Sequence, residues 1–117
     1  MGTSHQFGKK GEDRAVAYLL RSGFVLLARN WRFRHYELDI VCRSKDLLVV
    51  VEVKARHETG LSPEDLLGFR KREHLRRAAD AFVRSHGLDL EVRFDLILLT
   101  GPEMELTHIP DAVQPFE

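Results

Sequence analysis

The 117-residue sequence predicts one α/β domain in which a central sheet is flanked by helices. Three observations support this prediction. Residues 37–42 alternate acidic and aliphatic side chains with a period of two, which is typical of a strand with one apolar face. Residues 47–54 are mostly aliphatic, as in a strand buried on both faces. Residues 8–22 and the segment after Ser62 repeat apolar side chains at helical spacing.

The length suits a single domain over residues 1–117, with a peripheral acidic tail from about residue 101. No stretch of eighteen uncharged apolar residues occurs, and the N-terminus lacks a basic region followed by an apolar core. We therefore expect a cytoplasmic protein without a membrane span. The single cysteine, Cys42, lies in an apolar run, where a small buried side chain is more usual than a reactive thiol.

The first expected helix covers residues 8–22 and ends at Gly23. Glu12 lies three positions before Ala15 and seven before Leu19, so it continues the stripe that faces the core. The alternative is an acid of the first helical turn that is favoured there by the helix dipole. The sequence leaves both interpretations open.

Three strands should follow, over residues 24–33, 37–42 and 47–54. Residues 43–46 are polar and short enough for a tight hairpin, which makes the second and third strands antiparallel neighbours. If Ser44 and Lys45 form a two-residue turn, Asp39 lies opposite Val50 and Glu37 lies opposite Glu52.

In this hairpin Glu37, Asp39, Glu52 and Lys54 project from one face of the sheet. Neighbouring carboxylates repel each other unless a cation lies between them, and a hard divalent metal with oxygen ligands would supply that charge. A salt-bridge cluster in which Lys54 pairs with Glu37 or Glu52 explains the same spacing. The spacing does not decide between the two.

A second helix is expected after Ser62, which has the character of an N-cap and precedes a proline and two acids. Gly68 divides a short first turn from the main body, and Gly87 ends the helix. A further strand over residues 92–99 and a short edge strand over residues 106–109 complete the predicted order of helices and strands. In the longer strand, Asp95 pairs most simply with Arg93.

The zero net charge conceals an uneven distribution. Residues 1–86 carry 17 basic and 11 acidic side chains, whereas residues 87–117 carry 1 and 7. Five of the eight residues 70–77 are basic; such a cluster is usually a solvated helix face, but it could also contact phosphates. The six histidines lack the paired spacing of zinc sites, and no glycine-rich phosphate loop is present.

Five short motifs follow one another in this element order: Gly11-Glu12, residues 37–41, residues 51–56, Phe69-Arg70-Lys71 and Arg93-Phe94-Asp95. Together they resemble the YraN family of small bacterial proteins. That family is similar to the restriction-endonuclease-like fold of the PD-(D/E)xK nucleases, which includes Holliday-junction resolvases. Two positions depart from the pattern: Tyr36 replaces the usual glycine of the family, and Leu38 replaces a proline frequent in the superfamily.

The resemblance implies a mixed sheet flanked by helices, in the order α-β-β-β-α-β with a short edge strand, and a metal site. Asp39 and Glu52 would bind Mg²⁺ or Mn²⁺, with the carbonyl of Val53 and the carboxylate of Glu12 as further ligands. Lys54 would orient the attacking water and stabilise the developing negative charge. The residues implied to contact phosphates are Arg56, Arg70 and Lys71.

The sequence therefore favours a metal-dependent nuclease that acts on DNA, including branched or damaged forms. The alternatives are a non-cutting nucleic-acid-binding module and a protein-interaction subunit with salt-bridged carboxylates. Catalysis is favoured because Glu12, Asp39, Glu52 and Lys54 are all in place, whereas a pure binder has little use for carboxylates that repel phosphate. A homodimer would suit an enzyme that acts on two strands, although no single residue requires it.

Overall fold

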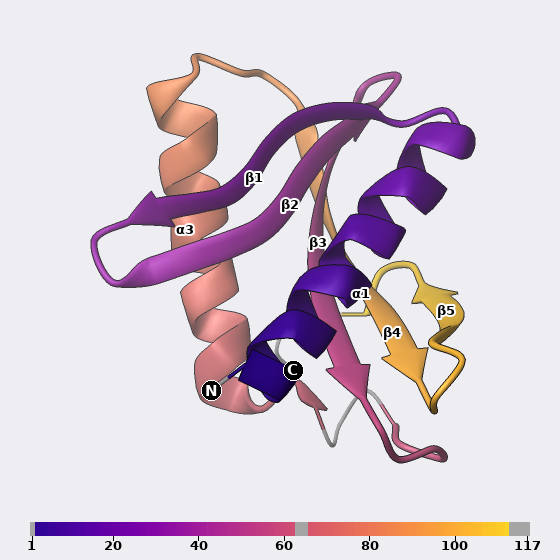
Figure 1. The fold of residues 1–117 in the computed structure, drawn as a ribbon. Coiled ribbons are helices and arrows are strands. Elements are labelled where there is room, and N and C mark those ends of the chain that lie inside the picture. Colours follow the sequence, from indigo (N-terminus) through magenta and orange to yellow (C-terminus); the bar gives the residue numbers. More distant parts are fainter. Residues whose placement is uncertain (1, 63–65, 113–117) are drawn as a thin grey trace.

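The structure is a computed structural model that describes residues 2–62 and 66–112, with side chains described from Phe7 onward. One five-stranded sheet has the order β1-β2-β3-β4-β5, with β3 and β4 parallel and the other neighbours antiparallel. The element order, edge strand included, confirms the predicted fold class (Figure 1). The elements are α1 (Gly2–Arg21), β1 (Val25–Phe33), β2 (Tyr36–Ser44), β3 (Leu47–Arg56), α3 (Phe69–Ser85), β4 (Glu91–Thr100) and β5 (Glu105–Ile109).

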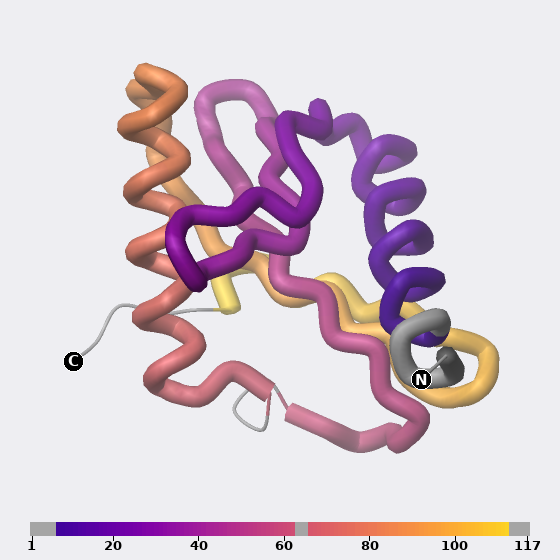
Figure 2. Tube along the Cα trace, turned by 60° about the vertical axis from the view of Figure 1, so that its left-hand side comes forward, coloured from indigo at the N-terminus to yellow at the C-terminus, as the bar shows by residue number. Residues whose placement is uncertain are grey.

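The two helices cover opposite faces of the sheet, as Figure 2 shows. The apolar stripe of α1, which includes Ala15 and Leu19, packs against Val51 and its neighbours on one face. The stripe of α3, which includes Leu75 and Phe82, packs on the other face. The central strand β3 is therefore buried on both faces, as its aliphatic sequence predicted.

Several local predictions are confirmed. Gly68 is the N-cap of α3, so the main body of the second helix begins directly after it. The predicted helix start after Ser62 falls largely on residues 63–65, which lie outside the described residues. Cys42 is 1% exposed, and burial raises the pKa of its thiol to about 12, in keeping with a packing role. Among the described residues, no helix combines the length and apolar composition needed to cross a membrane.

The register of the β2–β3 hairpin differs from the predicted one by two residues. Ser44 pairs with Leu47, so the turn consists of Lys45 and Asp46, and Lys45 has a φ of 56°. Two-residue hairpin turns favour a positive φ at their first position, a requirement that the polar composition of the loop did not reveal. Because the shift is even, every side chain keeps its predicted face, and Asp39 comes into line with Glu52 instead of Val50.

Pairing between β2 and β3 stops before either strand ends. Ile40 and Val51 form the last pair, yet β2 remains paired with β1 as far as Tyr36, and β3 remains paired with β4 as far as Arg56. The sheet thus divides, and the β1–β2 hairpin crosses in front of α3 while β3 runs on toward the other end of the molecule (Figure 1). Asp39 is the first residue of β2 beyond this division.

Candidate active site

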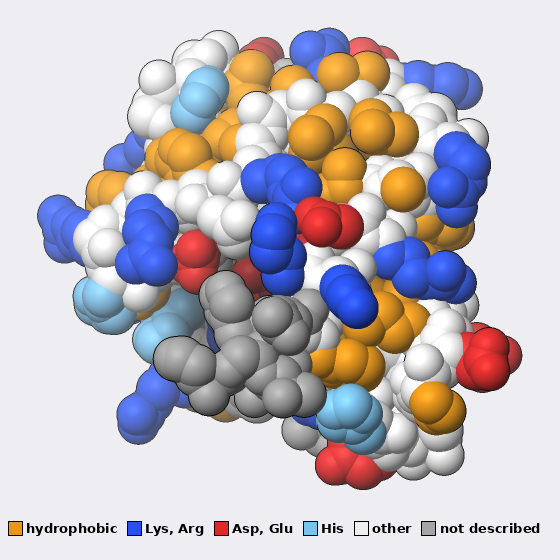
Figure 3. All heavy atoms as spheres, in the orientation of Figure 1, with side chains coloured by type: hydrophobic (Ala, Val, Ile, Leu, Met, Phe, Trp, Pro, Cys, Tyr) orange, Lys and Arg blue, Asp and Glu red, His pale blue; other side chains and the backbone are white. Residues whose placement is uncertain are grey.

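A cavity of about 920 Å³ opens where the sheet divides. Its walls come from the first half of α1, the middle of β1, the free part of β2 and the end of β3. Figure 3 shows this face of the molecule, on which basic and acidic side chains lie side by side near the centre. Four residues predicted for the metal and catalytic site line the cavity: Glu12, Asp39, Val53 and Lys54.

Asp39 spans the division of the sheet. Its Oδ2 atom accepts a hydrogen bond of 2.9 Å from the backbone N–H of Val53. The side chain therefore accepts a hydrogen bond from a backbone N–H of β3 at a position where β3 is no longer paired with β2. Burial raises the pKa of Asp39 to about 7, the negative charge of Glu52 adds to this effect, and the hydrogen bond from Val53 opposes it. The positive charge near Asp39 is thus too small to offset its burial and the negative charge of Glu52.

Glu52 lies deeper, with 3% of its side chain exposed. Its Oε2 atom is 3.1 Å from Nζ of Lys71 and 3.3 Å from Nζ of Lys54. Its Oε1 atom is buried and has no hydrogen-bond partner among the described residues. One oxygen of this carboxylate is therefore shared by two ammonium groups, while the other is available for a further ligand.

Lys54 follows Glu52 at the period-two spacing that keeps both on one face of β3. The salt-bridge cluster left open by the sequence is therefore present, with Glu52 as the partner of Lys54. Glu37 instead lies 3.6 Å from Arg32, at the exposed edge of the hairpin. The side chain of Lys54 remains 20% exposed and lines the cavity, where a bound molecule could meet it.

Glu12 reaches the cavity because α1 approaches the sheet closely at Gly11. A Cβ atom at Gly11 would meet the Cβ atom of Ala55 at 3.0 Å and a methyl group of Leu99 at 3.1 Å, so glycine permits this approach. Oε1 of Glu12 accepts hydrogen bonds from Arg29 at 2.7 Å and from Asn30 at 3.0 Å. Glu12 thus faces the site, in agreement with the first of the two interpretations that the sequence left open, and Arg29 of β1 already neutralises it.

The carboxylates Asp39 and Glu52 fit a divalent cation. A cation would satisfy the free Oε1 atom of Glu52 and relieve the repulsion that raises the pKa of Asp39. In the part of the chain that the structure describes, no group of three or more His, Cys, Asp or Glu side chains is arranged to hold a metal. A third carboxylate ligand would therefore require Glu12 to move toward Asp39 and Glu52, with its Oε1 atom held by Arg29 and Asn30.

The three residues predicted to contact phosphates have different positions. Arg56 lines the cavity, and its guanidinium group donates to the carbonyl of Ala55 at 2.9 Å. Lys71 belongs to the site through its contact with Glu52, an association between β3 and α3 that no spacing in the sequence signals. Arg70 is exposed on α3 and lies outside the cavity lining.

Comparison with known proteins places the chain in a family. The model of "Uncharacterised protein family UPF0102" matches residues 11–99, which include the predicted motifs from Gly11-Glu12 to Arg93-Phe94-Asp95. The chain belongs to the UPF0102 family. This is the YraN family that the motifs predicted, so the predicted resemblance is confirmed.

Relatives in the UPF0102 family match over nearly the whole chain. A UPF0102 protein of Parabacteroides distasonis is 44% identical over 115 residues, which cover 96% of this chain and 95% of the relative. One from Nitratidesulfovibrio vulgaris is 46% identical over 112 residues, covering 92% and 84%.

A solved structure shares the fold. Hjc, a Holliday junction resolvase from Archaeoglobus fulgidus, superposes with a TM-score of 0.56 at 23% identity, covering 88% of this chain and 76% of that chain. The restriction-endonuclease-like fold predicted from the sequence is thereby confirmed.

Proposed function

We propose that this UPF0102 protein is a metal-dependent nuclease that hydrolyses phosphodiester bonds in DNA. The main support is the half-buried Asp39 and the buried Glu52 beside Lys54, at a cavity open to a substrate. Glu52 keeps a buried oxygen without a protein partner, and the pKa of Asp39 is raised. A buried carboxylate oxygen without a partner and a carboxyl group with a raised pKa both point to a ligand at this place.

Each residue has a role in this proposal. Asp39 and Glu52 would hold Mg²⁺ or Mn²⁺, and the carbonyl of Val53 and the carboxylate of Glu12 would be further oxygen donors. When bound, the cation would lower the pKa of a water molecule and offset the charge of the phosphate. Lys54, anchored by Glu52, would donate a hydrogen bond to that water or to a phosphate oxygen and stabilise the developing negative charge.

Arg56 would bind the phosphate next to the scissile one, because its side chain lines the same cavity as Asp39 and Lys54. The shared fold with a Holliday junction resolvase makes DNA, including branched forms, the first substrate to test. The cytoplasmic location and the homodimer expected from the sequence remain predictions.

A second candidate function has support from the ion pairs themselves. Both lysines already neutralise Glu52. Arg29 already neutralises Glu12, to which Asn30 adds a hydrogen bond, as expected for a non-cutting module that binds nucleic acid or protein. A cation-binding site should gain thermal stability from added Mn²⁺ by linkage, whereas a salt-bridged module should keep the same melting temperature.

The decisive assay measures cleavage of single-stranded, duplex and four-way-junction DNA with Mg²⁺ or Mn²⁺. We expect Asp39→Ala and Lys54→Ala each to reduce the rate by at least about a hundredfold, because each removes charge stabilisation from the transition state. Arg14→Gln, an exposed charge change on α1, is the matched control and should cut normally. Cleavage that persists in both site variants would identify a contaminant and defeat the proposal.

A further inference from the structure

The tip of the β1–β2 hairpin carries an aromatic and basic surface that the proposed chemistry does not use. Phe33 pairs with Tyr36, so Arg34 and His35 form the two-residue turn, and Arg34 has a φ of 58°. The guanidinium group of Arg34 lies over the ring of Phe33, 5.1 Å from its centroid. Basic side chains gather at this end of the hairpin, at the left of Figure 3.

A row of rings leads from the core to this tip. The rings of Trp31 and Phe33 are nearly parallel, with centroids 6.5 Å apart and planes 5° apart. Phe33 and Tyr36 are also 6.5 Å apart, and His74 of α3 lies 4.7 Å from Tyr36. Trp31 and Tyr36 pack against the core, so the row is held rigidly while Phe33 extends it outward.

Beside Phe33 lies a cavity of about 490 Å³ between the hairpin and α3. This volume is within the range of small-molecule sites. One wall is aromatic, and the other comes from positions of α3 at helical spacing. The lining residues are Phe33, Arg34, Tyr36, Arg77, Asp80, Ala81, Arg84 and Ser85.

The charge of this hairpin cavity favours an anionic ligand. Asp80 is paired with Arg84 at 3.1 Å, so these two side chains offset each other. Arg34 and Arg77 add two positive charges to the lining; Arg77 has a long contact of 3.8 Å with Glu73 on the exposed helix surface. A ligand that offers a flat ring and a negative group would match both walls.

We propose that the hairpin cavity binds an unpaired nucleobase together with its phosphate. The base would stack on the Phe33 and Tyr36 wall, and Arg34 and Arg77 would bind the phosphate. A base within a duplex has both faces covered by its neighbours, so the cavity selects nucleic acid with single-stranded character.

This inference rests on the proposed function for the class of ligand, and it narrows the substrate of the same site. Tyr36 and Asp39 lie three positions apart on β2, roughly 10 Å along the strand, so their side chains leave opposite faces of it. A nucleic-acid strand with one base in the hairpin cavity would therefore pass around the edge of the hairpin to reach the proposed cleavage site.

A binding experiment in the presence of a chelator tests the inference without cleavage. The probes are a short fluorescein-labelled oligothymidylate and a blunt duplex of the same length, measured by fluorescence anisotropy. Phe33→Leu, which keeps an apolar side chain but removes the stacking ring, should weaken oligothymidylate binding by about tenfold. Its affinity for the duplex should stay within about twofold of the wild-type value.

Arg77→Gln provides a second, independent variant on α3. It should weaken oligothymidylate binding by about threefold and reduce the slope of log affinity against log salt by roughly one phosphate contact. Arg14→Gln removes the same charge from α1, outside the cavity lining, and should leave binding unchanged. Trp31 is the single tryptophan, so quenching of its emission by oligothymidylate in the wild type, and its loss in Phe33→Leu, gives a local readout.

The inference is overturned if Phe33→Leu and Arg77→Gln bind oligothymidylate like the wild type, or if they weaken duplex and single-strand binding equally. Circular dichroism and the melting temperature show whether each variant is folded. The two proposals fail separately: single-strand binding that depends on Phe33, without cleavage under any cation, contradicts only the nuclease proposal. Cleavage with unaltered binding in both variants contradicts only the hairpin cavity.

Discussion

Two aspartates, on the strands either side of β3, differ in how the fold compensates their burial. Asp95 on β4 has a fully buried side chain, which accepts two hydrogen bonds of 2.8 Å from Arg93 and further ones from His108 and from the N–H of Asp111. Asp39 on β2 accepts a hydrogen bond from the N–H of Val53 and has the charge of Glu52 nearby.

The pKa values of Asp95 and Asp39 differ accordingly. Burial by itself would raise the pKa of Asp95, but the hydrogen bonds from His108 and Arg93 outweigh it and hold the pKa below its ordinary value. Burial and the charge of Glu52 instead raise the pKa of Asp39 to about 7. Burial alone therefore does not distinguish a structural acid from a ligand-binding one; the number of donors around each carboxylate does.

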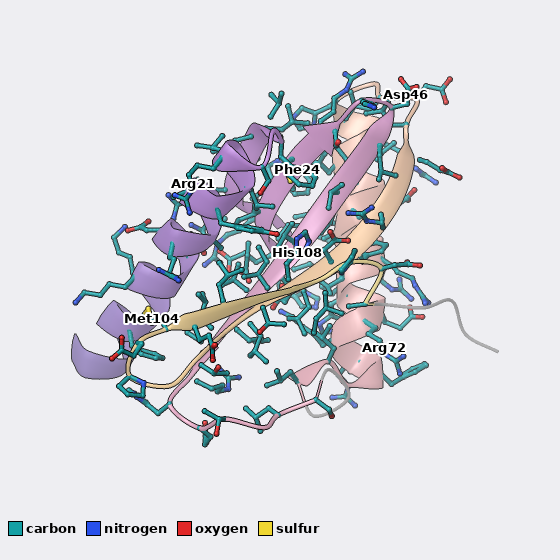
Figure 4. The ribbon with its side chains drawn as sticks, turned by 90° about the vertical axis from the view of Figure 1, so that its right-hand side faces the viewer. Arg21, Phe24, Asp46, Arg72, Met104 and His108 are labelled. Carbon is teal, nitrogen blue, oxygen red and sulfur yellow. The ribbon has the colours of Figure 1, made fainter. Side chains whose placement is uncertain are left out.

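The contacts of Asp95 show what a fully compensated acid does for a fold. His108 of β5, labelled in Figure 4, lies 2.7 Å from Asp95 and also contacts the hydroxyl group of Tyr18 on α1 at 2.9 Å. The network thus joins β4, β5 and α1, and the predicted pairing of Asp95 with Arg93 is confirmed as one part of it.

The largest expected effect is on stability at Asp95. Asp95→Ala leaves Arg93 and His108 without their acceptor and should lower the free energy of unfolding by about 3 kcal/mol. Urea denaturation at neutral pH measures this loss. A loss below about 1 kcal/mol would mean that Asp95 contributes no more than an ordinary surface ion pair, and that the comparison with Asp39 is wrong.

Replacing Asp39 is expected to raise the free energy of unfolding at neutral pH, which is the opposite of the effect at Asp95. The folded protein binds the proton of Asp39 more tightly than the unfolded chain does, so the stability from this group is present below about pH 4 and is lost as the pH rises through 7. Asp39→Asn should therefore match the wild type at pH 4 and exceed it at pH 8 by about 2 kcal/mol, with an upper limit of about 4 kcal/mol. Urea denaturation without divalent cations, from pH 4 to 8, checks the trend; a constant difference across this range contradicts it.

The smallest expected effect concerns Lys71. Its ammonium group competes with a cation for Glu52, so Lys71→Met should strengthen Mn²⁺ binding by about threefold to tenfold, or about 1 kcal/mol. Arg70→Met removes the same charge from the adjacent, exposed position and serves as the control. Calorimetric titration with Mn²⁺ measures both variants. Equal Mn²⁺ affinities of the two variants would show that Lys71 acts only through its charge at a distance and not through its contact with Glu52.

The sequence predicted the shared face of the site residues better than its detailed pairing. Period two places Asp39 and Glu52 on one face of the hairpin for any even shift, so the misplaced turn at Lys45 left the candidate site intact. The helical stripe likewise brought Glu12 toward the sheet. Both results depend on local periodicity alone.

The sequence contains no comparable pattern that predicts contacts between distant segments. Lys71 reaches Glu52 because α3 packs beneath the sheet, and its position in a run of basic residues suggested a solvated surface. Arg29 lay in a strand with mixed polarity, and nothing in its neighbourhood indicated Glu12 as its partner. Such ion pairs follow from the packing of whole elements, which no spacing within one element encodes.

Because pairing between β2 and β3 ends early, the two central carboxylates, Asp39 and Glu52, are held in place by different neighbouring strands. Asp39 belongs to the hairpin with β1, whereas Glu52 is fixed by β4, and the last residue pair shared by their strands is Ile40 with Val51. A rotation of the hairpin about that pair would alter the spacing of the acids, but it would break the hydrogen bond from the N–H of Val53 to Asp39 and shift Trp31 and Tyr36 from the core.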